Sequence, residues 1–359
     1  MNWELSNFLR TIAITVVILI HASHPWWFGA HGEASLAQID WEISIDTAIN
    51  QVGRLAVPIF VILSGFGLAQ SELSKPFELK GFIQRRCFRI LPPYIFFTIL
   101  NLSFSSQFQS IDWQDKLGQL FTALRDGSGD YHLYFLVIIM QCYISYPLLR
   151  HVRFSPLRFV GLLVGTFSLF SLRWGISLFG WFPSIAPYLP DSNSCIFWLP
   201  YFMIGIWLAK HQEWFAKLVQ KYSTDRWCMF WSIAAILELG EFYFAAIQMG
   251  AAEPAGHYGR PTVVLLTLTF LGWAMSWRNQ AGQDQAGRDG WLKKNLDTLG
   301  KSSFTIYLLH TQVLRLIAPL EFLGGIGYLL IASISSWLIG FWVWKIAKPI
   351  KELNLILGA

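Results

Sequence analysis

Apolar runs long enough to cross a bilayer recur along the whole chain, and they constrain its fold more than any other feature. They cover about 5–28, 46–70, 88–105, 131–149, 156–179, 194–209, 227–249, 260–277, 302–320 and 324–346. About 20 helical residues span the hydrocarbon core, where backbone polar groups must pair within the protein. The sequence therefore predicts an all-α, polytopic integral membrane protein of about ten transmembrane helices, forming one domain over 1–359.

The composition agrees with a membrane protein. Hydrophobic residues make up 54% of the 359 residues and charged residues only 14%, whereas about a quarter of a soluble domain is charged. The 18 tryptophans and 29 phenylalanines suit aromatic belts at the two membrane interfaces. The net charge of +5 follows from how basic residues are sorted between loops, so we expect no nucleic acid partner.

Lysine and arginine concentrate in alternate connections. All but six of the 27 lie in 75–89, 150–158, 210–226, 278–301, at Arg10 or in the tail from Lys345; the others are Arg54, Lys116, Arg125, Arg173, Arg260 and Arg315. Basic loops stay on the cytoplasmic side of a membrane protein. Both termini are therefore expected in the cytoplasm.

The sequence offers little support for metal or soluble-enzyme chemistry. The four cysteines, Cys87, Cys142, Cys195 and Cys228, have neither CxxC nor Cys/His ligand spacing, so we predict no disulfide framework and no metal site. GxSxG, Walker A and GxGxxG motifs are absent, which leaves soluble hydrolase and nucleotide-binding folds without support.

The first apolar run carries Arg10 near its start and His21 well inside it. Eleven helical residues make three turns plus roughly 20°, so the two share a face, about 16 Å apart along the axis. Ionisable groups inside membrane helices usually face a protein interior and mark a function. Arg10 lies at the expected cytoplasmic end, His21 in the outer half, and His24 one turn further. An arginine reaching the headgroups and a histidine bonded to a neighbouring helix would be the purely structural interpretation.

Arg86 and Arg89 form a second candidate site at the expected cytoplasmic end of the third run. Three residues apart on a helix, they can close together on one anion, and guanidinium forks suit phosphate oxygens. An ordinary cluster of cytoplasmic basic residues is the alternative.

Later runs contain further polar or close-packing residues. They are Ser64, Gly65 and Phe66 in the second run, His132 at the start of the fourth, Glu238 and Glu241 in the seventh, and Tyr307 and His310 in the ninth. Glycine in the second run permits close helix approach, and Pro200 is expected to break the sixth run. Each polar residue could also be a hydrogen-bonded structural group.

Together these motifs resemble the membrane acyltransferase-3 family. The resemblance rests on the Arg-x10-His of the first run, on Ser64-Gly65-Phe66, on the Arg-x-x-Arg of RRCFRILPPY, and on HLYFL, FWLPYFMIG and SSFTIYLLH in order. It covers nearly the whole chain. Some members append a soluble extracytoplasmic SGNH-type domain, and this sequence is similar to the stand-alone form without one.

The resemblance implies a bacterial inner-membrane enzyme that moves an acyl group, commonly acetyl from acetyl-CoA, onto a hydroxyl of a carbohydrate or glycan. It implies His21 as the catalytic residue and Arg10, Arg86 and Arg89 as donor-binding residues, with the polar residues of the later runs and His24 in support. Expected partners are acyl-CoA, a glycan acceptor and the bilayer, with no permanently bound cofactor. Oligomer formation and glycan-synthesis partner proteins stay open.

Two mechanisms and two other functions stay open at the sequence level. His21 could act as general base on the acceptor hydroxyl or carry the acyl group covalently. Of the intramembrane histidines only His21 lies in the Arg-x10-His register, so replacing His24 or His310 is expected to cost less activity. A proton-coupled transporter or flippase would also use intramembrane His and Glu, and a haem protein could use His21 and His310 as axial ligands. The acceptor and the kind of acyl group are not determined.

Overall fold

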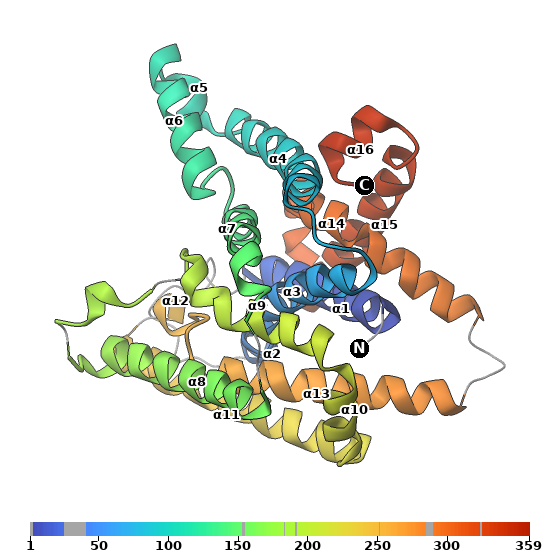
Figure 1. Cartoon of the computed structure of the whole chain (residues 1–359). Helices are drawn as coiled ribbons and strands as arrows, with labels where there is room; N and C mark the ends of the chain where they lie inside the picture. The colour runs from blue at the N-terminus through green and yellow to red at the C-terminus, as the bar shows by residue number, and fades with distance from the viewer. Residues whose placement is uncertain are drawn as a thin grey trace.

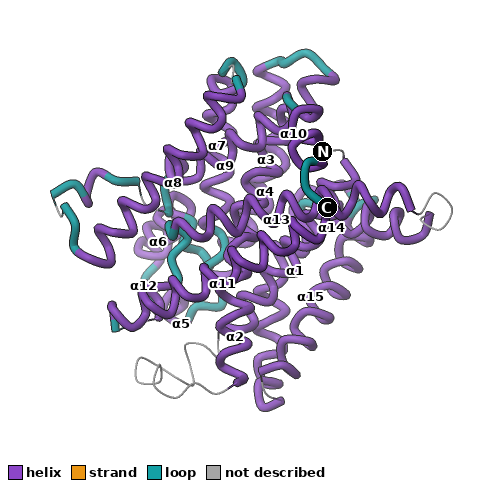
Figure 2. Tube along the Cα trace, turned by 90° about the horizontal axis from the view of Figure 1, so that it is seen from below, coloured by secondary structure: helices purple, strands orange, loops and turns teal. Residues whose placement is uncertain are grey.

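The computed structural model describes residues 3–24, 41–152, 155–182, 184–190, 192–250, 252–284, 290–323 and 325–359, and within these ranges every regular element is helical (Figures 1 and 2). The long helices are α1 (Trp3–His24), α2 (Trp41–Val52), α3 (Ala56–Ser74), α4 (Leu79–Ser103), α6 (Trp113–Asp126), α7 (Tyr134–Leu149), α8 (Pro156–Phe179), α9 (Cys195–Lys210), α11 (Thr224–Met249), α13 (Pro261–Asp284), α14 (Gly290–Ile317) and α15 (Gly325–Ala347). Shorter pieces are η3 (Gly53–Leu55), α5 (Ser106–Ser110), η4 (Ala186–Tyr188), α10 (Gln212–Gln220), α12 (Ala252–Ala255), η5 (Ala318–Leu323) and α16 (Lys351–Leu357).

The predicted apolar runs coincide with helices wherever the structure describes them. Six segments are long and apolar enough to cross a membrane: Glu4–Ser23, Ile45–Ser74, Pro156–Phe179, Thr224–Met249, Thr298–Leu323 and Gly325–Ala347. The runs at 131–149 and 194–209 correspond to the shorter apolar helices α7 and α9, and the other two lie in α4 and α13. The prediction of an all-helical membrane protein is therefore confirmed, with six candidate spanning helices among the described residues.

Two helices differ from the sequence prediction in detail. The second run is not one α-helix, because the 3₁₀ turn η3 separates α2 from α3. The break expected at Pro200 is wrong, since α9 continues from Cys195 to Lys210 with this proline inside it. Membrane helices tolerate a proline where neighbouring helices and small local adjustments satisfy the freed carbonyl.

Helices α3 and α9 pack backbone to backbone at the centre of the bundle. A side chain at Gly65 would collide with the carbonyl oxygen of Phe202, and one at Gly205 would collide with the carbonyl oxygen of Ile62. This reciprocal contact is the small-residue packing that membrane helices use to approach closely. The contact explains why glycine occupies both position 65 and position 205, and it confirms the close helix approach predicted at Gly65.

Helix α1 lies between α3 on one side and the α14–α15 pair on the other (Figures 1 and 2). The contact with α14 is close at one end, where a side chain on Gly300 would meet Cα and Cβ of Asn7. Trp337 of α15 donates its indole N–H to the hydroxyl of Thr15 at 2.9 Å. These contacts hold α1 in the interior of the bundle, where Arg10 and His21 are partly buried.

The outer faces of the peripheral helices are apolar. On α15 the exposed large side chains recur every fourth residue, as Ile326, Leu330, Ile334, Leu338, Trp342 and Ile346. Residues four apart lie on one face of a helix. This stripe is what a lipid-facing surface requires, because hydrocarbon tails accept apolar side chains without a desolvation cost.

We expect Gly65→Val to destabilise the protein by about 1–3 kcal/mol, because the added side chain must separate two backbones that now touch. Thermal unfolding in detergent measures this loss. Gly165→Val is the matched control, since Gly165 lies in α8 with nothing within 4 Å of an added Cβ. Equal unfolding temperatures for the two variants would show that the α3–α9 contact is not tight.

Candidate active site

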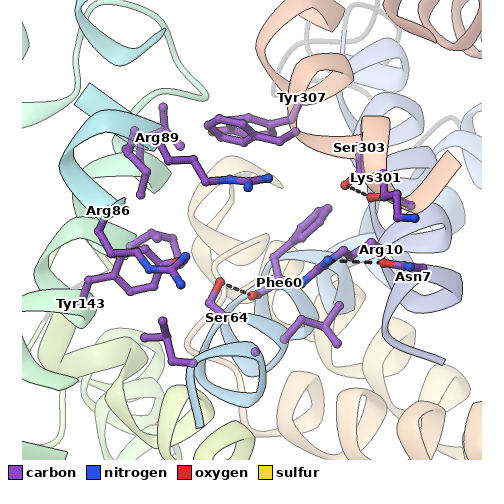
Figure 3. A pocket seen from close by; sticks show the side chains of 18 of the residues that line it. Asn7, Arg10, Phe60, Ser64, Arg86, Arg89, Tyr143, Lys301, Ser303 and Tyr307 are labelled. Carbon is purple, nitrogen blue, oxygen red and sulfur yellow. Dashed lines mark hydrogen bonds between the residues drawn. The ribbon is translucent and has the colours of Figure 1, made fainter. Parts of the chain in front are cut away.

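A cavity of about 690 Å³ opens between α1, α3, α4, α7, α14 and α15. Its cationic lining residues are Arg10, Arg86, Arg89, Lys301 and Lys348. Figure 3 shows the three guanidinium groups pointing into the same space, Arg10 from α1 and the other two from α4. The structure thus brings together the two basic motifs of the sequence, which lie about 75 positions apart in the chain.

The three arginines are not neutralised by carboxylates. Among the described residues, none of Arg10, Arg86 and Arg89 takes part in an ion pair. Arg10 donates to the amide oxygen of Asn7 at 3.4 Å, and the guanidinium carbon of Arg86 lies 5.3 Å from the ring centre of Tyr143. Aromatic rings and a neutral amide hold these cations in place without cancelling their charge. The cavity is consequently a strong site for an anion.

The SGF motif divides between the cavity and the core. Ser64 lines the cavity and donates its hydroxyl to the carbonyl of Phe60 at 2.8 Å. Gly65 forms the contact with α9 described above, and Phe66 is fully buried. Of the three residues predicted to support the site, only Ser64 therefore faces the cavity.

Three of the predicted histidines meet at one place in the bundle. Nδ1 of His21 lies 2.9 Å from Nε2 of His310, and Nδ1 of His310 lies 2.6 Å from the carbonyl oxygen of Tyr307. The ring of His132 packs against those of His310 and Tyr307, with centres 5.1 and 5.3 Å apart. The structure assembles this cluster from α1, from α14 and from the segment that precedes α7.

Tyr307 joins the histidine cluster to the cavity. Its ring lines the cavity, as Figure 3 shows, while its hydroxyl donates to the carbonyl of His132. The ring also meets Phe135 at 5.9 Å, and Phe135 in turn contacts Phe60. This aromatic wall stands between the arginines and the imidazoles, and His21 itself does not line the cavity.

A polar network holds the segment that carries His132. Arg315 donates to Asp130 Oδ2 at 2.9 Å and also bonds Asn101 of α4. Nδ1 of His132 lies 3.5 Å from the same carboxylate. Burial alone would raise the pKa of Asp130, but the interaction with His132 and the charge of Arg315 more than offset it, so this pKa lies below its usual value. Asp130 is thus a buried carboxylate held ionised.

Sequence reasoning missed Asp130, Arg315 and Tyr131. The ring of Tyr131 meets that of His21 edge-on, with centres 4.8 Å apart, while 57% of Tyr131 stays exposed. Asp130 and Tyr131 stand immediately before HLYFL, so extending that motif by two residues would have found both. Nothing in the sequence pairs Arg315 with Asp130, because 185 positions separate them.

The two predicted glutamates lie in a different cluster. Glu238 forms a fully buried ion pair with Arg260, which also donates to Gln51 of α2 at 2.7 Å. Glu241 accepts a hydrogen bond from Thr262. These contacts tie α2, α11 and α13 together, and neither glutamate lines the cavity. The side chain of His24 lies outside the described residues.

The geometry of the imidazole pair bears on the haem alternative. Two axial nitrogens must stand about 4 Å apart to hold a metal ion between them, given metal–nitrogen distances of about 2 Å. The ring nitrogens of His21 and His310 that face each other are 2.9 Å apart and share a hydrogen bond. They are therefore not arranged as axial ligands.

A family model described as "Acyltransferase domain" matches residues 5–345 of the chain. The match spans α1 through nearly all of α15 and includes every residue of the cavity and the histidine cluster discussed above except Lys348. No curated protein and no solved structure matches the sequence.

We expect Asp130→Asn to destabilise the protein by about 1–2 kcal/mol, since Arg315 loses a charge-assisted bond that its partial exposure already weakens. The matched control is Asp126→Asn, because Asp126 is exposed and, among the described residues, forms its ion pair with its exposed neighbour Arg125. Thermal unfolding in detergent measures both variants.

The same comparison predicts a pH dependence. A carboxylate whose folded pKa is lowered stabilises the protein above its unfolded pKa and loses this effect as the pH falls through the folded value. The stability difference between wild type and Asp130→Asn should therefore be full at pH 7 and shrink below about pH 4. A difference that is the same at every pH would contradict an ionised Asp130.

Proposed function

The chain belongs to the acyltransferase family whose model covers residues 5–345, and from this premise we propose that it transfers an acyl group, most simply acetyl, from cytoplasmic acyl-CoA to a hydroxyl of a carbohydrate acceptor. The observation that carries the proposal is the cavity with three unpaired arginines, whose inner wall, Tyr307, hydrogen-bonds the imidazole cluster around His21. One end of this arrangement suits an anionic donor, and the other suits acid–base chemistry.

The proposal includes an orientation in the membrane. Arg10 lies in the first half of α1, Lys301 in α14 and Lys348 just after the end of α15, and all three line the cavity. In the sequence they belong to the segments in which basic residues concentrate. Because basic segments are retained in the cytoplasm, the cavity is assigned to the cytoplasmic side, together with both termini. With about ten spans, the protein would be a multi-pass component of a bacterial inner membrane, and its histidine cluster would lie toward the periplasm.

The cavity suits the nucleotide end of acyl-CoA. CoA carries a 3′-phosphate and a pyrophosphate, and arginine forks bind such oxygens in pairs. A volume of about 690 Å³ lies within the usual range of small-molecule sites. Arg86 and Arg89, on one face of α4, can grip a single phosphate, while Arg10 and Lys301 from the opposite side contribute to a second.

The thioester must then reach His21. Arg10 and His21 are separated by eleven residues of one helix, or about 16 Å, a separation that the extended pantetheine arm can cover. The arm would pass the aromatic wall formed by Tyr307 and Phe135. Apolar walls suit this uncharged chain, and they keep water from the thioester.

The transfer step needs one base and no cofactor. The acceptor oxygen attacks the thioester carbonyl while His21 takes the hydroxyl proton; the tetrahedral adduct then collapses, breaking the carbon–sulfur bond and releasing CoA thiolate. The imidazolium returns the proton to the thiolate. A covalent acyl-imidazole at His21 is the second route. Incubation with radiolabelled acetyl-CoA and no acceptor separates the two, because only the covalent route labels the protein.

The surroundings of His21 support a carbohydrate acceptor. Tyr131 presents an exposed aromatic face beside the imidazole, and an aromatic ring offers an apolar surface with a polar edge, which suits the alternating CH and OH faces of a sugar. Asn101, Gln312 and Arg315 form a hydrogen-bonded group at the same end of α4 and α14. These groups can recognise sugar hydroxyls.

The transporter alternative is less well supported. A proton relay needs ionisable groups along a continuous path, but Glu238 is committed to the buried pair with Arg260 and Glu241 to Thr262. Both glutamates stand away from the cavity and from His21. Their arrangement suits a structural tie between helices.

We expect Arg86→Ala and Arg89→Ala each to weaken acetyl-CoA binding by about 1.5–3 kcal/mol, the value of one charge-assisted bond. Binding is measured on inverted vesicles, whose outer face is the cytoplasmic one, and on right-side-out vesicles, which should not bind added acetyl-CoA. Arg85→Ala is the matched control, because Arg85 lies on the same helix but not in the cavity. Equal affinity in the Arg86→Ala/Arg89→Ala double variant would exclude the cavity as the donor site, and binding from the other face would reverse the orientation.

We expect His21→Ala to retain acetyl-CoA binding and to lose transfer by about 10²–10⁴-fold, as for loss of a general base. Transfer is measured as alkali-labile radiolabel in the glycan fraction of vesicles. His151→Ala, at an exposed position outside the cluster, is the control, and His21→Gln replaces alanine if that variant does not fold. Near-normal transfer in a folded His21 variant would exclude the catalytic role.

A further inference from the structure

His21 and His310 form a hydrogen-bonded pair whose proton positions can be read from their partners. His310 is fully buried. Its Nδ1 faces the carbonyl oxygen of Tyr307 at 2.6 Å, and its Nε2 faces Nδ1 of His21 at 2.9 Å. Each of the two nitrogens of His310 thus has one close polar partner.

The backbone carbonyl decides the tautomer. A carbonyl oxygen only accepts hydrogen bonds, so Nδ1 of His310 must carry a proton. Among the described residues no carboxylate pairs with His310, while the carboxylate of Asp130 pairs with Arg315 and lies 3.5 Å from Nδ1 of His132. A buried imidazolium without a counter-ion is costly, so His310 is neutral and its Nε2 is an acceptor. Nδ1 of His21 is then the donor of the shared bond.

This arrangement has a direct consequence for His21. A neutral imidazole carries one N–H. In the neutral form of His21 this N–H lies on Nδ1, where it donates to His310, and the lone pair lies on Nε2. We propose that His310 is a positioning residue that holds His21 in this tautomer and orientation, so that Nε2 can accept the acceptor's proton. The inference deepens the proposed acyl transfer and rests on it.

The role is comparable to that of the carboxylate in a Ser-His-Asp triad, which orients its histidine and fixes its tautomer. When Nε2 of His21 takes a proton, its Nδ1–H becomes a charge-assisted donor to His310, and that bond strengthens as the step proceeds. Because His310 is neutral, the positive charge stays on His21, near the departing thiolate. Tyr307 helps to hold the pair in place. Its backbone carbonyl bonds His310, and its hydroxyl donates to the carbonyl of His132.

The pair also revises an expectation from the sequence. Replacement of His310 was expected to matter little, because it lies outside the Arg-x10-His register. Its direct bond to His21 predicts instead a large effect on turnover. Donor affinity should be spared, since His310 does not line the cavity that contains the arginines.

Two substitutions of similar size separate positioning from packing. His310→Gln keeps an acceptor near the place of Nε2, whereas His310→Leu fills the space without one. Rates of transfer are measured in vesicles at varied acetyl-CoA. We expect His310→Leu to lower the maximal rate by about 10–100-fold with an unchanged KM for acetyl-CoA, and His310→Gln to restore most of the rate. If the maximal rates of His310→Gln and His310→Leu fell only in proportion to their loss of thermal stability, the proposal would be overturned.

The tautomer itself is tested by ¹⁵N NMR of protein with labelled histidine in detergent, with His21→Ala used to assign the signals among the eight histidines. The expected result is a protonated Nδ1 and a lone pair on Nε2 of His21, lost in His310→Leu. A protonated Nε2 in the wild-type protein would overturn the proposal. Because this NMR measurement needs no substrate, it separates failure of the positioning role from failure of the proposed acyl transfer.

Discussion

The cost of placing a polar group in hydrocarbon decides where every charged side chain in the spanning part of this protein lies. The outward faces of α8, α11 and α15 carry large apolar side chains, while ionisable groups are turned inward. They gather in three places: the cavity with Arg10, the imidazole cluster around His21, and the Arg260–Glu238 pair. The close backbone contact of α3 with α9 makes this inward arrangement compact. Each cluster reduces the cost of burying ionisable groups in the membrane, and each does so through different contacts.

The Arg260–Glu238 pair reduces this cost by direct ion pairing and connects helices. Both side chains are fully buried, and Arg260 donates to one carboxylate oxygen of Glu238 and to Gln51. Removing one partner of such a pair leaves an uncompensated buried charge and typically costs several kcal/mol. The pair therefore ties α2 and α11 to the start of α13.

Tyr307 belongs both to the cavity and to the imidazole cluster. Its ring faces the arginines, its carbonyl accepts from His310, and its hydroxyl reaches the segment of His132. In the described part of the chain no carboxylate forms an ion pair with the arginines of the cavity, so a bound anion would offset the cost of their partial burial. In the cluster, by contrast, His21 and His310 share a hydrogen bond. The cationic lining and the imidazole cluster are the two features on which the proposed acyl transfer rests.

The sequence by itself determined the membrane class, the all-helical fold and the family. Apolar runs of helical length and basic connecting segments are local patterns, and the physics of the bilayer relates each of them directly to spanning helices and their connections. It also placed Arg10 and His21 on one helix face, and Arg86 beside Arg89, since helical geometry fixes neighbours three or eleven residues apart. Tertiary structure alone decided which of these faces meet. The His21–His310 bond and the Arg315–Asp130 pair join residues 289 and 185 positions apart, and no periodicity records such contacts. For the same reason the sequence could not tell Glu238, a buried structural ion, from a residue of the site. Pro200 was misjudged because neighbouring helices, invisible in a linear pattern, support the helix through it.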